Sequence, residues 1–254
     1  MTDASLVIFT GPSLGPGDAS ALIDADIRPP AAQGDIFAAA LEAKPKAIGL
    51  IDGVFQSEPA VRHKEILWAI GQGITVFGAA SMGALRAAEL HGFGMIGVGL
   101  IYRWYRMTPL AADDAVAVLH GPTALGAAAM SDGLINLRLT FKHCRRRGMF
   151  DRETERALID IANRLPYRQR TRATILEVAH AEGISPLPDL AAIDKHWRDQ
   201  KRLDAEALVK LMAACQASDR WPQSQPPDGQ EITDAWANDL IDAGFSLDAV
   251  TGAL

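Results

Sequence analysis

The stretch ITVFGAASMGALRAAEL, residues 74–90, changes its hydrophobic period in the middle and decides the fold class. Residues 74–81 form a short apolar, partly β-branched run, which is typical of a buried strand. Residues 82–90 consist of strong helix formers, with Met82 and Leu85 spaced along one face. A buried strand that leads directly into a helix predicts a β-α unit with Ser81 at its junction.

The rest of the first half repeats this alternation. Strand-like runs cover residues 6–11, 47–53, 74–81 and 97–105, and helix-like segments cover residues 17–25, 34–44, 59–73 and 82–90. Strands separated by helices of this length predict right-handed crossovers and a parallel sheet. We therefore expect an α/β fold with a doubly wound, mostly parallel sheet in the N-terminal part.

From about residue 130 the pattern becomes helical. Amphipathic segments cover residues 131–148, 151–165, 168–183, 204–216 and 234–244. Residues 221–230 are rich in Pro and Gln and are typical of a linker. We expect two domains, an α/β core domain over residues 1–128 and an all-helical C-terminal region over residues 129–254.

Composition excludes several classes of protein. The chain has 254 residues, is 48% hydrophobic and carries a formal net charge of −6, which gives no reason to expect nucleic acid or an anionic membrane surface as a partner. It contains no run of eighteen apolar residues and no signal-peptide pattern. Cys144 and Cys215 lie far apart in the sequence, which favours a reduced, cytoplasmic protein.

Neither a metal nor a cofactor is expected. The six histidines show no spacing typical of metal ligands. The segment GPSLGPG, residues 11–17, has the glycines of a phosphate loop but lacks its lysine, and its prolines remove N–H donors.

Ser81 has two interpretations. Ala79, Ser81 and Gly83 follow the spacing of a strand–turn–helix nucleophile elbow, with Ala in place of the first glycine. In such a turn the N–H groups of Met82 and Gly83 would point at the group that Ser81 attacks. Alternatively, Ser81 is an ordinary N-cap, and the small residues let strand and helix pack closely.

Other polar residues follow predicted strands or face the same edge. Ser13, Asp52 and Ser81 each follow a strand, so we expect them at one edge of the sheet, where ligands of such folds bind. His63 shares a helix face with inward apolar residues and could reach Asp52 and Ser81 as a Ser/His/Asp set. Equally, His63 could be a core histidine bonded to a carbonyl, and Asp52 could bond only the turn backbone.

Two basic features have similar alternatives. Arg86, one turn after Ser81, could clamp an anionic substrate or lie over the surface. Residues 138–172 carry more Lys and Arg than Asp and Glu, opposite in sign to the whole chain. They form either a solvated helical face or a docking surface for an acidic protein.

Seven dissimilar blocks follow one another over roughly residues 6–140: VIFTGPSL, PPAAQGDI, AIGLIDGVF, AVRHKEILWAI, FGAASMGALRAAEL, GMIGVGLIYRWY and DDAVAVLHGP. In their order and spacing these blocks resemble the TfuA-like family. The resemblance implies an accessory protein of YcaO-type ATP-dependent enzymes, which install thioamides in peptide or protein backbones, as in RiPP biosynthesis. It further implies a hydrolase that releases sulfide from the C-terminal thiocarboxylate of a ubiquitin-like sulfur carrier.

Together with the resemblance, the residues suggest a specific site. Ser81 is the expected nucleophile, His63 its base and Asp52 the residue that orients the base; the expected substrate-binding residues are Met82, Gly83, Arg86 and Ser13. The alternatives are a non-catalytic adaptor that docks the carrier onto the YcaO enzyme, and a hydrolase in which Ser81 only binds the anion. The carrier's Gly-Gly tail is expected to enter a narrow cleft lined by small residues from Gly78 to Gly83, with its acidic body against residues 145–147.

Overall fold

The computed structural model describes residues 6–55, 58–108, 111–121, 128–222 and 233–251. Five parallel strands form one sheet in the order β2-β1-β3-β4-β5. The strands are β1 (Leu6–Phe9), β2 (Asp26–Arg28), β3 (Ala47–Leu50), β4 (Thr75–Gly78) and β5 (Ile96–Gly97). The expected α/β fold is therefore confirmed, and the strand order reverses between β1 and β3.

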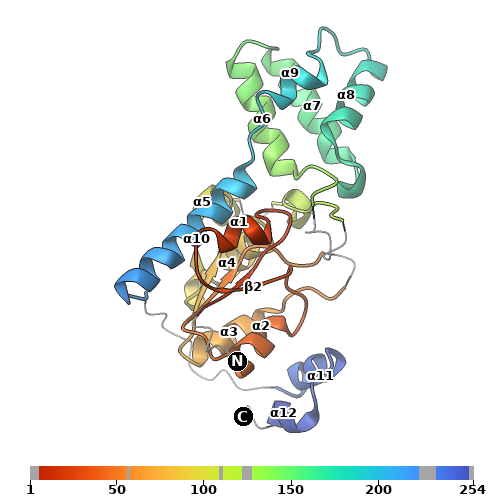
Figure 1. Ribbon diagram of the computed structural model, residues 1–254. Coiled ribbons are helices and arrows are strands. Elements are labelled where there is room, and N and C mark those ends of the chain that lie inside the picture. The colour runs from red at the N-terminus through yellow and green to blue at the C-terminus, as the bar shows by residue number, and fades with distance from the viewer. Residues whose placement is uncertain (1–5, 56–57, 109–110, 122–127, 223–232, 252–254) are drawn as a thin grey trace.

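Both faces of the sheet are covered, as a parallel sheet requires (Figure 1). Val7 and Phe9 of β1 belong to the core under α2 (Asp35–Glu42) and α3 (His63–Gly71). Leu6 and Ile8, which point the other way, belong to a second core. That face is covered by α1 (Pro16–Ser20) and by α10 (Gln200–Ser218). Because α1 has only five residues, α10 from the C-terminal half supplies most of the cover.

Helix α4 (Met82–Leu90) follows β4 and lies unusually close to the sheet. A Cβ atom at Gly83 would lie 1.7 Å from the Leu50 carbonyl oxygen, and one at Gly78 would lie 2.2 Å from the Gly83 oxygen. Only glycine permits this approach of two backbones. The close-packing interpretation is therefore correct for Gly78 and Gly83.

The strand predicted over residues 97–105 is wrong. β5 has only two residues, and helix α5 (Gly99–Met107) follows it at once. Ile101 and Tyr105 are its buried residues, and they are four apart, which is a helical spacing. The Asp204 carboxylate of α10 accepts the Ile101 N–H at 2.7 Å and so fixes the start of the helix. Asp204 lies about a hundred residues away in the sequence, so a local hydrophobic pattern does not predict this contact.

Strand β2 was not predicted. Its three residues are only partly buried, and two of them are charged, so they carry no strand pattern. The other first-half elements lie where they were expected. Helix α4 has the expected bounds, and most of the others are shorter because the ends of helices and strands are their least regular parts.

The helical C-terminal region is confirmed, but its helices occupy three different places (Figure 1). A helical unit with its own core projects beyond the sheet; it consists of α6 (Leu134–Arg146), α7 (Arg152–Arg164), the 3₁₀ turn η4 (Tyr167–Gln169), α8 (Arg172–Ala181) and α9 (Leu190–Asp194). Helix α10 returns to the sheet. Helices α11 (Asp234–Asp242) and α12 (Leu247–Thr251) lie beside α2 and α3, where Trp236 packs edge-on against Phe37.

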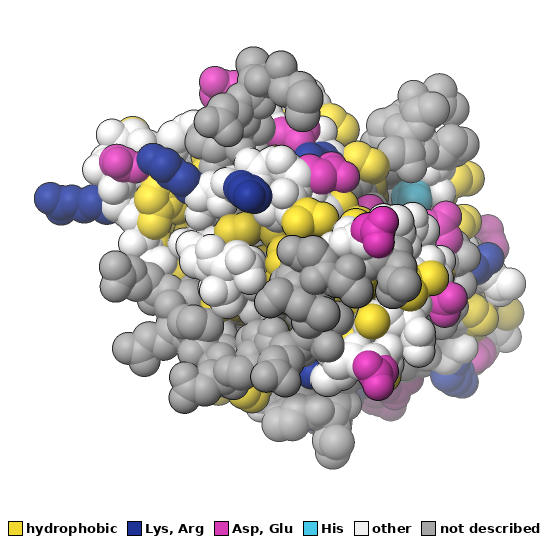
Figure 2. Space-filling view, turned by 90° about the horizontal axis from the view of Figure 1, so that it is seen from below, with side chains coloured by type: hydrophobic (Ala, Val, Ile, Leu, Met, Phe, Trp, Pro, Cys, Tyr) yellow, Lys and Arg dark blue, Asp and Glu magenta, His cyan; other side chains and the backbone are white. Residues whose placement is uncertain are grey.

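The remaining elements are two 3₁₀ turns, η1 (His91–Phe93) and η2 (Asp113–Ala115). Most of the predicted linker, residues 223–230, lies outside the described residues. Seen from the end that carries α11 and α12, the described surface mixes acidic, basic and apolar side chains (Figure 2). A cavity that could hold a ligand lies toward the opposite end of the molecule, at the carboxyl ends of the strands.

Candidate functional site

A cavity of about 200 Å³ opens at the carboxyl ends of the central strands. Pro12 follows β1, Asp52 follows β3, and Ser81 follows β4; all three line the cavity. In doubly wound sheets ligands bind at this edge, where the strand order reverses. Here the reversal lies between β1 and β3, so the cavity has the position that the topology predicts for a ligand site.

The turn that presents Ser81 is strained. Ala80 has a φ angle of +64°, and the Ser81 N–H donates to the Ala79 carbonyl at 2.8 Å, which closes a tight three-residue turn. A non-glycine residue in this region costs about 1–2 kcal/mol. Ser81 stands at the N-cap position of α4, but its side chain makes no capping bond. Its hydroxyl has no hydrogen-bond partner in the described part of the chain, and Ser81 lines the cavity.

The two N–H groups expected beside Ser81 differ in availability. Gly83 donates its N–H to the Ile51 carbonyl at 3.3 Å and does not line the cavity. The expectation that the Gly83 N–H binds substrate is therefore not supported by the geometry, because the same close approach that requires glycine engages its N–H. Met82 lines the cavity, and its N–H has no acceptor among the described residues.

Ser13 and Asp52 contact each other. The Asp52 carboxylate, only 1% exposed, accepts the Ser13 hydroxyl at 2.6 Å and the N–H groups of Gly11 and Ser13, each at 2.9 Å. Asp52 therefore anchors the loop after β1. Within the described part of the chain the Asp52 carboxylate contacts no histidine, so it does not orient a base in this structure.

His63 does not face the cavity. Its side chain is 46% exposed, and its Nε2 lies 2.7 Å from the Glu89 carboxylate. Arg86 donates to the same carboxylate at 2.7 Å and to the Val61 carbonyl at 3.0 Å. Burial acts in the opposite direction, but the hydrogen bonds from His63 and Arg86 lower the pKa of Glu89. The expected inward direction of His63 is wrong, and His63 and Arg86 join α3 to α4 instead.

The inward position near the start of α3 belongs to Glu65. Its carboxylate accepts N–H groups from Gly34 and Ile36 of the α2 N-terminus and from Arg62, at 2.6–3.3 Å. These donors draw the side chain inward, although its charge argues for a surface position.

The far wall of the cavity is a roof that the sequence did not predict. We use "roof" for residues Asp113–His120 together with Tyr167 and Arg168 of η4; its cavity-lining members are Asp113, Val116, Ala117, Val118, Leu119, His120, Tyr167 and Arg168. The middle of the roof is held by Lys201 of α10, which donates to the Val116 carbonyl at 2.7 Å. Burial lowers the pKa of Lys201. The roof segments lack periodicity, so no pattern indicated them.

His120 is the histidine that lines this cavity. Its Nδ1 lies 2.9 Å from the Gly121 carbonyl oxygen. Because a carbonyl only accepts, Nδ1 must carry the proton of this bond, which leaves Nε2 of the neutral ring as a proton acceptor. The sequence signal that could have pointed to His120 as a site residue was its place in the block DDAVAVLHGP, which carries the family resemblance.

The glycine and alanine residues expected to form a narrow cleft, and the residues of the expected basic rim, do not line the cavity. Ala79 and Ala80 are fully buried in the core under α10, and neither lines the cavity. Arg145 is paired with Glu155, whereas Arg146 and Arg147 are exposed at the end of α6. Among the described residues no group of three His, Cys, Asp or Glu side chains could hold a metal ion.

Comparison with protein families places part of the chain in a known family. Residues 52–171 match the family model described as TfuA-like protein, whereas the search of curated proteins finds no match. The matched range begins at Asp52 and ends just after the roof, so it contains most of the cavity lining. In the described part of the chain, no helix has both the length and the apolar character needed to cross a bilayer.

Proposed function

Residues 52–171 belong to the TfuA-like family, and from this premise we propose that the protein releases sulfide from a thiocarboxylated ubiquitin-like sulfur carrier. Family membership suggests involvement with YcaO-dependent thioamidation. In this proposal the YcaO enzyme performs the ATP chemistry, and the present chain supplies its sulfide. The proposal of a hydrolytic step is argued from the residues that line the cavity.

The observation that carries the proposal is the environment of Ser81. Its hydroxyl and the neighbouring Met82 N–H, neither of which is bonded by any described residue, belong to the cavity-lining residues at the start of α4. A thiocarboxylate is an anionic acyl group, so attack on its carbon builds a second negative charge. The Met82 N–H and the positive end of the nine-residue helix α4 would stabilise that charge. Arg168, which lines the cavity rim, would attract the anion in place of Arg86.

His120 is the proposed base in place of His63. The Ser81 oxygen bonds to the thiocarboxylate carbon, and its proton passes to His120 Nε2. The carbon–sulfur bond then breaks, and sulfur leaves as hydrosulfide with a proton from His120, which leaves an ester on Ser81. Water, deprotonated by His120, cleaves the ester and regenerates Ser81. The sum is thiocarboxylate plus water giving carboxylate, hydrosulfide and one proton.

One observation favours the adaptor as the second candidate. The Ser/His/Asp set expected from the sequence is not assembled, because Asp52 is engaged by Ser13 and Gly11 and His63 by Glu89. An adaptor needs no such set. It would bind the carrier and leave sulfur capture to the YcaO enzyme.

The test uses purified protein and thiocarboxylated carrier without the YcaO enzyme. Carrier mass and free sulfide are followed together for wild type, Ser81→Ala and the control Ser20→Ala, whose hydroxyl lies on exposed α1. The proposal expects conversion to carboxylate by wild type and Ser20→Ala, an acyl-enzyme on Ser81, and loss of conversion in Ser81→Ala. Full activity of Ser81→Ala would eliminate the nucleophile. Binding without conversion by wild type would establish the adaptor.

A further inference from the structure

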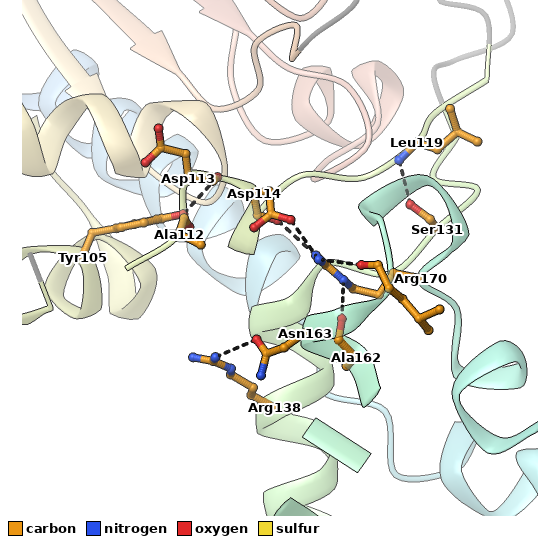
Figure 3. A network of polar contacts seen from close by, with 11 residues as sticks. Tyr105, Ala112, Asp113, Asp114, Leu119, Ser131, Arg138, Ala162, Asn163 and Arg170 are labelled. Carbon is orange, nitrogen blue, oxygen red and sulfur yellow. Dashed lines mark hydrogen bonds and ion pairs between the residues drawn. The ribbon is translucent and has the colours of Figure 1, made fainter. Parts of the chain in front are cut away.

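The roof of the cavity consists of two chain segments that are distant in sequence. One is Asp113–His120, which carries the proposed base, and the other is Tyr167 and Arg168 of η4. Neither belongs to the sheet that carries Ser81, so the position of His120 relative to Ser81 in their shared cavity depends on what holds these segments. Figure 3 shows Asp114, near the start of the first segment, in contact with Arg170, and Leu119, near its end, in contact with Ser131.

The Arg170 side chain holds the beginning of the roof. Its Nη1 donates to the Asp114 carbonyl at 3.2 Å and its Nη2 to the Asp114 carboxylate at 2.8 Å. The same guanidinium donates to the carbonyls of Ala162 and Leu165, at 2.9 and 3.1 Å (Figure 3). One side chain therefore joins η2 to the C-terminal end of α7.

The Arg170 main chain holds the other end of the roof. Its carbonyl accepts the Asp132 N–H at 2.7 Å. The neighbouring Ser131 hydroxyl accepts the Leu119 N–H at 2.7 Å, and the Leu119 carbonyl accepts the Met130 N–H at 2.7 Å. Leu119 directly precedes His120. Both ends of the first segment are thus fixed relative to one residue, which itself follows the second segment.

Stability alone does not explain an arginine here. Arg170 is only 1% exposed, and removing a guanidinium from water costs several kcal/mol. Its partners are three carbonyls and the half-buried carboxylate of Asp114, so most of its bonds go to neutral groups. An apolar side chain could fill the space. The guanidinium instead donates in fixed directions to four acceptors on two segments, η2 and the C-terminal end of α7.

We propose that Arg170 is a positioning residue, which sets the roof and so the position of His120 relative to Ser81. This inference rests on the proposed function for its catalytic consequence, whereas the geometric link between Arg170 and His120 can be measured without any turnover. Through Arg170, the helical unit α6–α9 becomes part of the active site. A shift of that unit, for example on binding a partner, would move the base relative to the nucleophile.

The test compares Arg170→Gln and Arg170→Lys with the control Arg164→Gln. Arg164 is an exposed arginine of the same helical unit, paired with Glu182. Three quantities are measured: the free energy of unfolding in urea, kcat and KM with thiocarboxylated carrier, and the NMR resonances of the His120 ring, assigned with His120→Gln. His180, which bonds within α8, is the internal reference.

The inference expects a particular combination of results. Arg170→Gln should lower kcat by about 10- to 100-fold with KM changed less than about 3-fold, since displacement of a catalytic group by about 1 Å has this effect. The His120 resonances should move and those of His180 should not, while Arg170→Lys recovers part of kcat. Wild-type kcat and unmoved His120 resonances in a destabilised variant would overturn the inference and leave Arg170 a structural residue.

A second variant covers failure of Arg170→Gln to fold. Asp114→Asn keeps the three carbonyl contacts and removes only the carboxylate, which is 35% exposed. It should produce the same changes at smaller size, and an unmoved His120 ring would again overturn the inference. If wild type itself converts no carrier, the proposed function fails, and the His120 resonances still decide whether Arg170 positions the roof.

Discussion

The Ser13 hydroxyl donates a 2.6 Å hydrogen bond to the Asp52 carboxylate, which also accepts the N–H groups of Gly11 and Ser13. This pair joins the loop after β1 to the end of β3, at the point where the strand order reverses. A carboxylate that is 1% exposed and accepts hydrogen bonds from three donors acts first as a structural anchor.

Asp52→Asn should therefore destabilise the fold. The amide can keep its oxygen on the N–H groups of Gly11 and Ser13 and turn its NH₂ group toward the Ser13 hydroxyl, but it loses the charge that strengthens these bonds. We therefore expect a loss of about 2 kcal/mol in the free energy of unfolding. Ser13→Ala removes one of the three bonds and should cost about 1 kcal/mol. Urea denaturation measures both, with exposed Asp160→Asn as control. A larger loss for Ser13→Ala than for Asp52→Asn would contradict this account.

Gly83→Ala tests the close packing of α4 on the sheet. The new Cβ would lie 1.7 Å from the Leu50 carbonyl oxygen, so the helix must move away from β3. We expect a loss of at least about 2–3 kcal/mol in the free energy of unfolding. Gly92→Ala is the matched control, because a Cβ there meets nothing within 4 Å. Equal stability of the two variants in thermal or urea denaturation would show that Gly83 is not needed for packing.

The sequence predicted the parts of the site that depend on strand ends. Ser13, Asp52 and Ser81 were expected at one edge because parallel strands finish there, and the structure brings Ser13 against Asp52 and lines one cavity with Asp52 and Ser81. Topology alone carried this expectation. It required no knowledge of side-chain direction.

The direction of individual side chains and the contacts between distant residues could not be predicted from local sequence patterns. The spacing of His63 to Ile66 predicted that His63 points inward. In the structure His63 is the first residue of α3, and the inward side chain is Glu65, whose carboxylate accepts backbone N–H groups. The strand predicted over residues 97–105 is a helix that starts against Asp204. Such contacts join residues up to about a hundred positions apart, and no local period records them.

Glu65 should make stability depend on pH. Burial raises the pKa of Glu65 to about 7 from 4.5, against the opposing effect of the N–H groups of Arg62 and Gly34. The folded state therefore binds the proton more tightly than the unfolded state does. The contribution of protonated Glu65 to the free energy of unfolding is fully present below pH 4.5 and is lost as pH rises through about 7. The change amounts to about 3 kcal/mol.

Urea denaturation between pH 4 and pH 8 measures this contribution. The control is Glu65→Gln, which cannot titrate, so the difference between wild type and variant isolates the one group. We expect wild type to lose stability relative to the variant as pH rises across this range. Parallel curves would mean that folding leaves the pKa of Glu65 unchanged, and a relative gain of stability by wild type with rising pH would mean that the N–H donors lower this pKa.

The two histidines near the start of α3 and in the roof should differ sharply in their effect on sulfide release. His63 is half exposed and bonded to Glu89, so His63→Ala should leave kcat within about 2-fold and cost at most about 1 kcal/mol of stability. His120 lines the cavity with an Nε2 that can accept a proton, so His120→Ala should lower kcat by about 10²- to 10⁴-fold.

The pH dependence of kcat separates a base from a merely structural residue. Because a general base must be unprotonated to act, sulfide release by wild type should show a limb that rises with pH, and His63→Ala should keep this limb. His120→Ala should lose it and retain only slow, flatter turnover. The reverse result, loss of the limb in His63→Ala alone, would require the His63 ring to leave Glu89 and reach Ser81 during turnover. Sulfide release is measured across pH 5–9 with saturating carrier, so that changes in carrier affinity do not enter the comparison.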